Sequence, residues 1–289
     1  MTGAEIRQPS GAPRPQRPLL AIDTATRRAA IAVGTGREVP LAGRSWEAGY
    51  RHGEELLAVL DELLREAGLG LRDLGGVVAG TGPGAFTGLR VGLATAKGLA
   101  YGLRVPVVGV ASTYGLARAA LLATAGRGGD PEGPGGAAGP EGPGEGDGLE
   151  LAVAMPAGPH DRYLARYRVA PEHGAPGTHR AADAGRGDGS LESPGDPMLV
   201  PGSEPLEPLI AGATLVAVDL AGRPGVSATA AALGRTAQDG LGTALLAAGR
   251  EALDRGEEDD VAALVPGYVT LPRGIAVQTG AIEWSRDLR

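Results

Sequence analysis

Residues 77–101 read VVAGTGPGAFTGLRVGLATAKGLAY, where an apolar run enters a glycine- and proline-rich loop and a helix-like segment follows. The pattern predicts a short buried strand at 75–79 and a helix at 87–102, so the loop is a strand-to-helix turn. Such turns often bind phosphate, because glycine allows unusual backbone angles and the N–H groups at a helix start attract anions. The stretch therefore predicts an α/β fold and raises the question of a phosphate site.

The loop does not match the common phosphate-binding motifs. A Walker A loop ends in Gly-Lys-Ser/Thr, which is missing here. Gly80, Gly82 and Ala85 have the spacing of a dinucleotide fingerprint, but Pro83 lies inside the turn and no acidic residue follows about 20 positions later. We favour a tight turn that needs glycine for its geometry, with Thr87 as the N-cap of the helix. A remnant phosphate site stays as the alternative, and its residues would be Asp23, Thr24, Gly82, Gly84 and Thr87.

The surrounding sequence extends the alternation of strands and helices, which is typical of α/β folds. Two strands are predicted at 19–22 and 29–33 with a polar hairpin turn between them, and a helix at 53–67 carries its leucines on one face. A strand at 105–110 precedes a helix that is capped by Ser112 or Thr113 and ends near residue 125. Weaker elements follow, namely strands at 149–154, 163–169, 198–202 and 214–218 and helices at 229–233 and 240–255.

Composition divides the chain into segments. The 289 residues include 50 glycines and 23 prolines, and these two residue types make up most of 126–148, which predicts a disordered insert. The predicted organisation is a disordered N-terminal tail (1–18), a first subdomain (19–125), the insert, a second, smaller and looser subdomain (149–265, with an irregular loop at 171–197) and a partly docked C-terminal tail (266–289).

Charge and residue usage exclude several function classes. The chain has no cysteine, which excludes disulfides, thiolate nucleophiles and cysteine-bound zinc. Its net charge of −7 and its aromatic content of 3% argue against stand-alone nucleic-acid binding, which depends on phosphate contacts. The start of the sequence has no apolar run of the kind found in a secretory signal, and no stretch approaches the ~18 apolar residues of a membrane span. We therefore expect a cytoplasmic protein that makes no contact with a membrane.

The helix at 87–102 carries a second feature. Gly88, Gly92, Ala96 and Ala100 recur every four residues and form a ridge of nearly bare backbone along one face. Such a ridge allows very close packing, either against the chain's own sheet or against a helix of a second protein. The sequence alone does not separate these two alternatives.

Three segments together resemble the TsaB (YeaZ) family: 20–34 (LAIDTATRRAAIAVG), 52–69 (HGEELLAVLDELLREAGL) and 77–112 (VVAGTGPGAFTGLRVGLATAKGLAYGLRVPVVGVAS). The resemblance implies the fold shared by actin, sugar kinases and heat-shock chaperone ATPases (the ASKHA fold), in two subdomains. It implies a part in making threonylcarbamoyladenosine at position 37 of tRNAs that read codons beginning with A. The resemblance is strong over about 19–122 and weak beyond residue 149.

The resemblance also implies the partners. These are the catalytic, metal-bearing transferase subunit TsaD, paired with the chain through helices, and the small ATPase TsaE, with tRNA contacted only through the complex. A homodimer in the absence of TsaD is left open. We expect the partner surface to consist of residues on the two long N-terminal helices, namely His52, Leu56, Leu60, Leu63, Gly88, Leu89, Gly92, Leu93, Ala96 and Ala100.

The chain departs from TsaD where TsaD is catalytic. The resemblance implies that a His-x-x-x-His pair follows the strand at 107–110 in TsaD, and here Ser112 and Leu116 stand at those two positions. Leucine cannot ligate a metal. We therefore expect no metal, no cofactor and no catalytic residue in this chain, which would act as a non-catalytic scaffold.

A second hypothesis is a stand-alone ATP-dependent kinase or nucleotide hydrolase of the same fold. It would need a nucleotide site between the subdomains, built from Asp23 and the loop at 80–87. Against it stands the run Thr24, Ala25 and Thr26, where kinases of this fold place a glycine-rich hairpin. A serine hydrolase is disfavoured because Ser112 has no Gly-x-Ser-x-Gly elbow around it.

Overall fold

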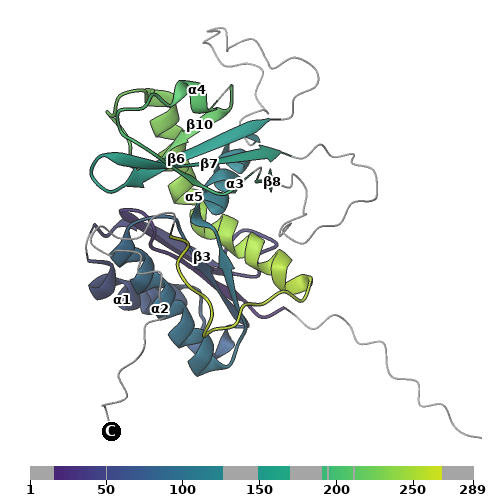
Figure 1. Ribbon diagram of the computed structural model, residues 1–289. Helices are drawn as coiled ribbons and strands as arrows, with labels where there is room; N and C mark the ends of the chain where they lie inside the picture. The colour runs from purple at the N-terminus through teal and green to yellow at the C-terminus, as the bar shows by residue number, and fades with distance from the viewer. Residues whose placement is uncertain are drawn as a thin grey trace, which may run out of the picture.

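The structure is a computed structural model that describes residues 16–49, 51–125, 149–169, 191–193, 195–210 and 212–268. The predicted insert at 126–148 lies outside the described residues, as do most of the predicted tails and of the irregular loop. The described part folds into two five-stranded β-sheets with helices around them, one sheet above the other in the view of Figure 1. The fold is therefore mixed α/β, as the sequence predicted.

The first sheet has the strand order β3-β2-β1-β4-β5. Strands β1 (Leu19–Asp23), β2 (Arg28–Gly34) and β3 (Ala42–Glu47) form an antiparallel meander. Strands β4 (Gly76–Gly80) and β5 (Val107–Val110) continue the sheet in parallel with β1. Strand β3 was not predicted, because its sequence AGRSWE has no apolar run and the strand is only half-buried at the sheet edge.

Both faces of this sheet are covered, because β1 is buried on both sides. Its even-numbered residues Leu20 and Ile22 face the core beneath α1 (His52–Glu66) and α2 (Phe86–Leu103). Its odd-numbered residues Leu19 and Ala21 face the core beneath α3 (Ser112–Ala125) and α5 (Ala228–Asp254). A short 3-10 helix, η1 (Leu71–Asp73), links α1 to β4.

The second sheet is built on a long hairpin of β6 (Glu150–Ala157) and β7 (Asp161–Val169). Strand β10 (Thr214–Ala217) pairs in parallel with β6, and the short strands β8 (Leu191–Glu192) and β9 (Met198–Val200) pair with β7. One face packs on α3 and α5, and the other covers a small core with α4 (Glu207–Ile210).

Helix α5 is one continuous helix of 27 residues, so the prediction of two helices at 229–233 and 240–255 is wrong. The helix continues through Gly234, where a Cβ would lie 2.0 Å from the Ala217 carbonyl oxygen, so this glycine allows close packing on β10. The start of α5 packs on β10 and its later turns pack on β1 and β2, so the helix joins the two sheets (Figure 1). The division into subdomains at 126–148 stays a prediction.

The chain leaves α5 through Gly256 and returns along the first sheet to the start of α2 (Figure 1). We call residues 257–268 the strap. The strap forms an isolated β-bridge between Asp259 and Val107 and buries Leu264 in the core beneath α1 and α2. Within the described ranges, no helix is long and apolar enough to cross a membrane.

Candidate functional site

Three N–H groups of the loop between β4 and α2 donate hydrogen bonds within the chain. The N–H of Thr81 donates to Val110 O at 2.8 Å, that of Gly82 to Ser112 Oγ at 3.0 Å, and that of Ala85 to Ala25 O at 2.8 Å. A Cβ at Gly84 would lie 2.2 Å from Ala25 O, so this glycine is required by the close approach of two loops. These contacts support the tight-turn interpretation, and the remnant phosphate site stays a prediction.

The prediction that Thr87 caps this helix is wrong. Helix α2 begins at Phe86, its N-cap is Ala85, and no side chain caps it. Thr87 lies one residue inside the first turn with its surface exposed. The predicted cap of α3 is also misplaced: Ser112 is the first helical residue and Thr113 the second, so neither stands before the helix.

Asp23 lies at the carboxyl end of β1 and is fully enclosed, with 0% of its surface exposed. Its Oδ1 accepts the N–H of Ala25 at 2.8 Å, and its Oδ2 accepts the hydroxyl of Ser112 at 2.5 Å. Burial raises the pKa of the Asp23 carboxyl above its usual value, and the two hydrogen bonds offset part of that effect. Gly80 is glycine because a Cβ there would lie 1.8 Å from Asp23 Oδ2. The carboxylate is thus bound inside the chain and has no open side for a substrate.

The small-residue ridge of α2 faces inward. A Cβ at Gly88 would lie 2.3 Å from Thr24 O, and a Cβ at Gly92 would lie 2.2 Å from Thr24 Oγ1. Thr24 Oγ1 itself donates to Gly88 O at 2.7 Å, which ties the hairpin after β1 to the helix. Of the two alternatives left by the sequence, the ridge packs against its own sheet.

The prediction of a partner surface from these residues is therefore wrong. All ten predicted residues are buried in the chain's own core: His52, Leu56, Leu60, Leu63, Gly88, Leu89, Gly92, Leu93, Ala96 and Ala100. His52 is a structural histidine, because its Nε2 lies 3.2 Å from Thr26 O and burial lowers its pKa, which favours the neutral ring.

The opposite side of the same two helices is open, and we call it the outer face. Leu57 of α1 is 59% exposed and Tyr101 of α2 is 80% exposed, both high for large apolar side chains. Gly98 and Gly102 have no atom within 4 Å of an added Cβ. Together with the exposed Ala94, these glycines form a second series of small residues at four-residue spacing. This spacing is the feature of the sequence that could have identified the outer face.

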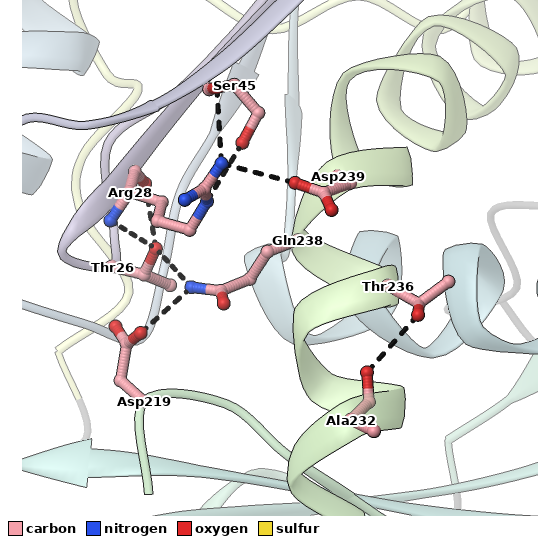
Figure 2. A network of polar contacts seen from close by, with 8 residues as sticks. All are labelled: Thr26, Arg28, Ser45, Asp219, Ala232, Thr236, Gln238 and Asp239. Carbon is pink, nitrogen blue, oxygen red and sulfur yellow. Dashed lines mark hydrogen bonds and ion pairs between the residues drawn. The ribbon is translucent and has the colours of Figure 1, made fainter. Parts of the chain in front are cut away.

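A polar junction connects the two sheets on their facing sides (Figure 2). The side chain of Gln238, 2% exposed on α5, donates to Thr26 Oγ1 at 3.2 Å and to Asp219 Oδ1 at 3.1 Å. The N–H of Arg27 donates to Asp219 Oδ2 at 3.0 Å. Asp219 adopts a left-handed backbone with φ of 53°, which places its carboxylate between the hairpin of the first sheet and α5.

Arg28 extends this junction, bonding Ser45 and pairing with Asp239 at 3.2 Å. The junction thus fills the place between the β1–β2 hairpin and the end of β10 with hydrogen-bonded side chains. The sequence could not predict it, because Thr26 and Gln238 lie 212 positions apart.

One small cavity lies at the tip of the β6–β7 hairpin. Its volume is about 30 Å³, and its lining includes His160, Arg162 and Arg223. This space holds one or two water molecules, whereas ligand pockets measure roughly 300 Å³ or more. The cavity is therefore too small for a nucleotide.

Comparison with known proteins shows which families the chain resembles. The sequence model of the family described as TsaD, tRNA N6-adenosine threonylcarbamoyltransferase, matches residues 46–134. The tRNA threonylcarbamoyladenosine biosynthesis protein TsaB of Haemophilus influenzae is 38% identical over 107 residues, which are 36% of this chain and 43% of that protein. TsaB of Escherichia coli is 35% identical over 103 residues, 35% of this chain and 43% of that protein. The chain thus spans less than half the length of these curated relatives.

Two solved structures share the fold over most of the chain. YeaZ of Pseudomonas aeruginosa superposes with a TM-score of 0.57 at 21% identity, covering 87% of this chain and 99% of YeaZ. A second structure from that organism, described as similar to peptidase YeaZ, gives a TM-score of 0.58 at 22% identity and covers 88% and 99%. These likenesses and the TsaD match confirm the predicted ASKHA-like fold. The sequence similarity to TsaB lies in the N-terminal region, and the structural likeness to YeaZ extends over most of the chain.

Proposed function

We propose that the chain is a subunit of the machinery that makes N6-threonylcarbamoyladenosine in tRNA, and that it acts by pairing with the transferase subunit TsaD. The observation that carries the proposal is the TsaD family match over residues 46–134, together with the sequence identity to TsaB. The match covers α1 and α2, the two helices that carry the outer face, and the strands β4 and β5. The chain and its proposed partner are therefore alike in the region by which they would meet.

The buried groups support a role without catalysis. Asp23 is enclosed. The Ser112 hydroxyl donates to Asp23 and accepts the N–H of Gly82. Leu116, which stands where TsaD is expected to carry its second histidine, is a fully buried core residue. A catalytic group has to reach a substrate atom within hydrogen-bond distance, and none of these three side chains has an open side.

The outer face supports the mode of pairing. Two related chains can pair about a pseudo-twofold axis, in which the same surface of each contacts the other. Gly98 and Gly102 let a partner helix approach closely, while Leu57 and Tyr101 supply apolar contact area around them. We propose that α1 and α2 meet the corresponding two helices of TsaD through this outer face, with the inner ridge serving only the chain's own core.

The remaining partners follow from the composition and the family. A net charge of −7 is unfavourable for direct binding of tRNA, so tRNA would contact the complex mainly through TsaD. TsaE would join the pair, in the cytoplasm, where tRNA is modified. In the absence of TsaD, the same outer face would pair with a second copy of this chain.

The test of the pairing is a titration of this chain against TsaD of the same organism, with substitutions on either side of α2. We expect wild type to form a 1:1 complex and Gly98→Trp to weaken pairing at least tenfold, because the indole would hold the partner helix away. Arg235→Met, a change at an exposed position of α5, should pair normally.

Two outcomes of this titration would contradict the proposal. Normal pairing by Gly98→Trp and by Leu57→Glu would place the interface elsewhere, and no complex with the wild-type chain would remove the proposed role. Circular dichroism of each variant ensures that a lost complex is not a lost fold, and the exposure of both positions predicts an unchanged fold.

A further inference from the structure

The strap touches the first sheet and α2 at three separate places, which is unusual for a segment without regular structure. At β5, the N–H of Asp259 donates to Val107 O at 2.9 Å, and Asp259 Oδ2 accepts the N–H of Gly109 at 2.7 Å. One strap residue thus satisfies two backbone groups of an edge strand that would otherwise be open to pairing. Gly109 permits this approach, since a Cβ there would lie 2.6 Å from the strap's Leu264.

The middle of the strap is fastened to α2 by Lys97. Its ammonium group donates to Leu264 O at 2.9 Å and to Ala262 O at 3.2 Å. Lys97 is the single lysine of the 289-residue sequence, in which arginine supplies every other long cationic side chain. A compact ammonium can donate to two carbonyls in different directions, whereas the planar guanidinium suits a flat bidentate acceptor. The use of lysine at this one position fits the geometry of the strap.

The far end of the strap is fastened by aromatic contacts. The ring of Tyr268 lies 5.4 Å from that of Phe86, the only phenylalanine in the chain, at the first turn of α2. The guanidinium of Arg90 lies 3.8 Å above the Phe86 ring, and its Nε donates to Tyr268 Oη at 3.2 Å. Gly267 N–H also donates to Thr81 O at 2.7 Å, which joins the strap to the loop before α2. In an aromatic-poor chain, this cluster concentrates rare residues at one contact.

These contacts hold α2 from the side opposite to α1. On its inner side the helix is held by the close packing of Gly88 and Gly92 on Thr24. On one flank it packs against α1, and on the other it is held by the strap through Arg90 and Lys97. Releasing the strap would therefore free one flank of the helix that carries Ala94, Gly98 and Tyr101.

We infer that the strap is a positioning element for the outer face: it fixes α2 so that the chain can pair with its partner, and Lys97 is its anchor. The inference rests on the proposed function, because the consequence of a fixed α2 is seen in pairing. A protein whose binding-competent conformer is only partly populated binds with an affinity reduced by that fraction. Substitutions at the contacts between the strap and α2, which we call strap variants, should thus weaken pairing without touching the partner.

The test uses the full chain and two readouts. Lys97→Met keeps the length and the apolar stem and removes the charge, Tyr268→Ala removes the far contact, and Arg235→Met is the matched control away from the strap. Hydrogen exchange of the amides of α2 and β5 reports whether α2 is fixed, and titration with TsaD reports pairing. We expect α2 amides to exchange at least tenfold faster in both strap variants, pairing to weaken at least tenfold, and α5 amides and the control to stay unchanged.

The outcomes separate the inference from the function on which it rests. Pairing within threefold of wild type by both strap variants overturns the inference and leaves the proposed function standing. Weakened pairing with unchanged exchange of α2 also overturns it, because Lys97 would then contact the partner directly. Failure of the wild-type chain to pair overturns the proposed function, and the inference falls with it.

Discussion

At the scale of single residues, the glycines of α2 decide which side of the helix is inside. Gly92 faces Thr24, where a Cβ would lie 2.2 Å from the buried Oγ1 and 3.3 Å from the Cβ of that residue. Gly98 faces open space. The same substitution at these two positions should therefore have opposite effects on stability.

The first prediction concerns this pair. Gly92→Ala should lower the free energy of unfolding by about 1–3 kcal/mol, the usual range for overpacking of a core. Gly98→Ala should raise it by up to about 1 kcal/mol, because alanine favours a helix more than glycine does. Urea unfolding of both variants measures the difference, and a loss of stability at Gly98 as large as that at Gly92 would contradict the assignment of the two faces.

The second prediction concerns the pH dependence that comes from Asp23. Because burial raises its pKa in the folded state, the folded chain binds this proton more tightly than the unfolded chain does. The stability from Asp23 is therefore fully present below the unfolded pKa and is lost as the pH rises through the raised folded pKa. Asp23→Asn removes this dependence, and its amide can still accept from Ala25 N–H and donate to Ser112 Oγ.

The measurement is urea unfolding from pH 4 to pH 8. We expect Asp23→Asn to be more stable than wild type at pH 8 and to lose that advantage toward pH 4. A variant that is less stable than wild type at pH 8 would show that the charged carboxylate is stabilising, which contradicts the direction of the pKa shift.

The sequence predicted the small-residue ridge of α2 correctly, but it predicted the wrong side of the helix as the partner surface. The four-residue spacing of Gly88 and Gly92 correctly predicted a bare ridge that allows close approach. The spacing could not show what approaches, because α2 carries a second small-residue series at Ala94, Gly98 and Gly102 with the same period. The position of Thr24, which follows β1 and packs directly against Gly88 and Gly92, distinguishes the two series.

At the scale of elements, α5 shows how packing overrides local propensity. Glycine is unfavourable within a helix, and the sequence predicted two helices, at 229–233 and 240–255, in place of the one that continues through Gly234. The helix continues through Gly234 because its bare backbone lies against β10, at the carbonyl of Ala217. A contact between distant residues of this kind leaves no signal in the local sequence.

The third prediction tests that contact. In Gly234→Ala, the Cβ would lie 2.0 Å from Ala217 O and 2.5 Å from Ala217 C, both backbone atoms of a buried strand that cannot rotate away. We expect a loss of at least about 2 kcal/mol in the free energy of unfolding. The exposed neighbour Arg235→Ala serves as the control and should stay within about 0.5 kcal/mol of wild type. Equal stability of the two variants would contradict the packing of α5 on β10.

At the scale of the whole molecule, the polar junction decides between a scaffold and a nucleotide enzyme. The kinase or hydrolase hypothesis needs a nucleotide site between the subdomains. Gln238, Thr26 and Asp219 join the two sheets there directly. Removing the Gln238 amide would leave Asp219 Oδ1 without its donor, whereas Thr26 Oγ1 would still accept the N–H of Arg28. We expect Gln238→Ala to cost about 1–3 kcal/mol in the free energy of unfolding, the usual penalty for buried groups left unpaired.

The fourth prediction is the absence of nucleotide binding by the isolated chain. A ligand present at a hundredfold excess over its Kd adds about 2.7 kcal/mol to stability. We expect magnesium ATP at millimolar concentration to leave the melting temperature unchanged, both in wild type and in Gln238→Ala. A clear rise in the melting temperature of the wild-type chain would favour the kinase or hydrolase hypothesis.

Fold prediction from sequence was strongest where the chain resembles the TsaB family. The order of strand, hairpin, helix, loop and helix over 19–122 matches the structure closely, apart from β3. The junction and the strap could not be predicted from the sequence. Both form only where α5, or the residues after it, contact the first sheet. A docked tail was expected from 266, whereas the strap already binds β5 at Asp259.

The most direct measurement of the central claim is the amount of threonylcarbamoyladenosine formed in a reconstituted reaction with TsaD, TsaE, tRNA and a source of the threonylcarbamoyl group. The account predicts that omitting this chain abolishes the modification, that adding it back restores it, and that Gly98→Trp, with its fold intact, does not. Unchanged modification without the chain would contradict its role as a subunit of this machinery.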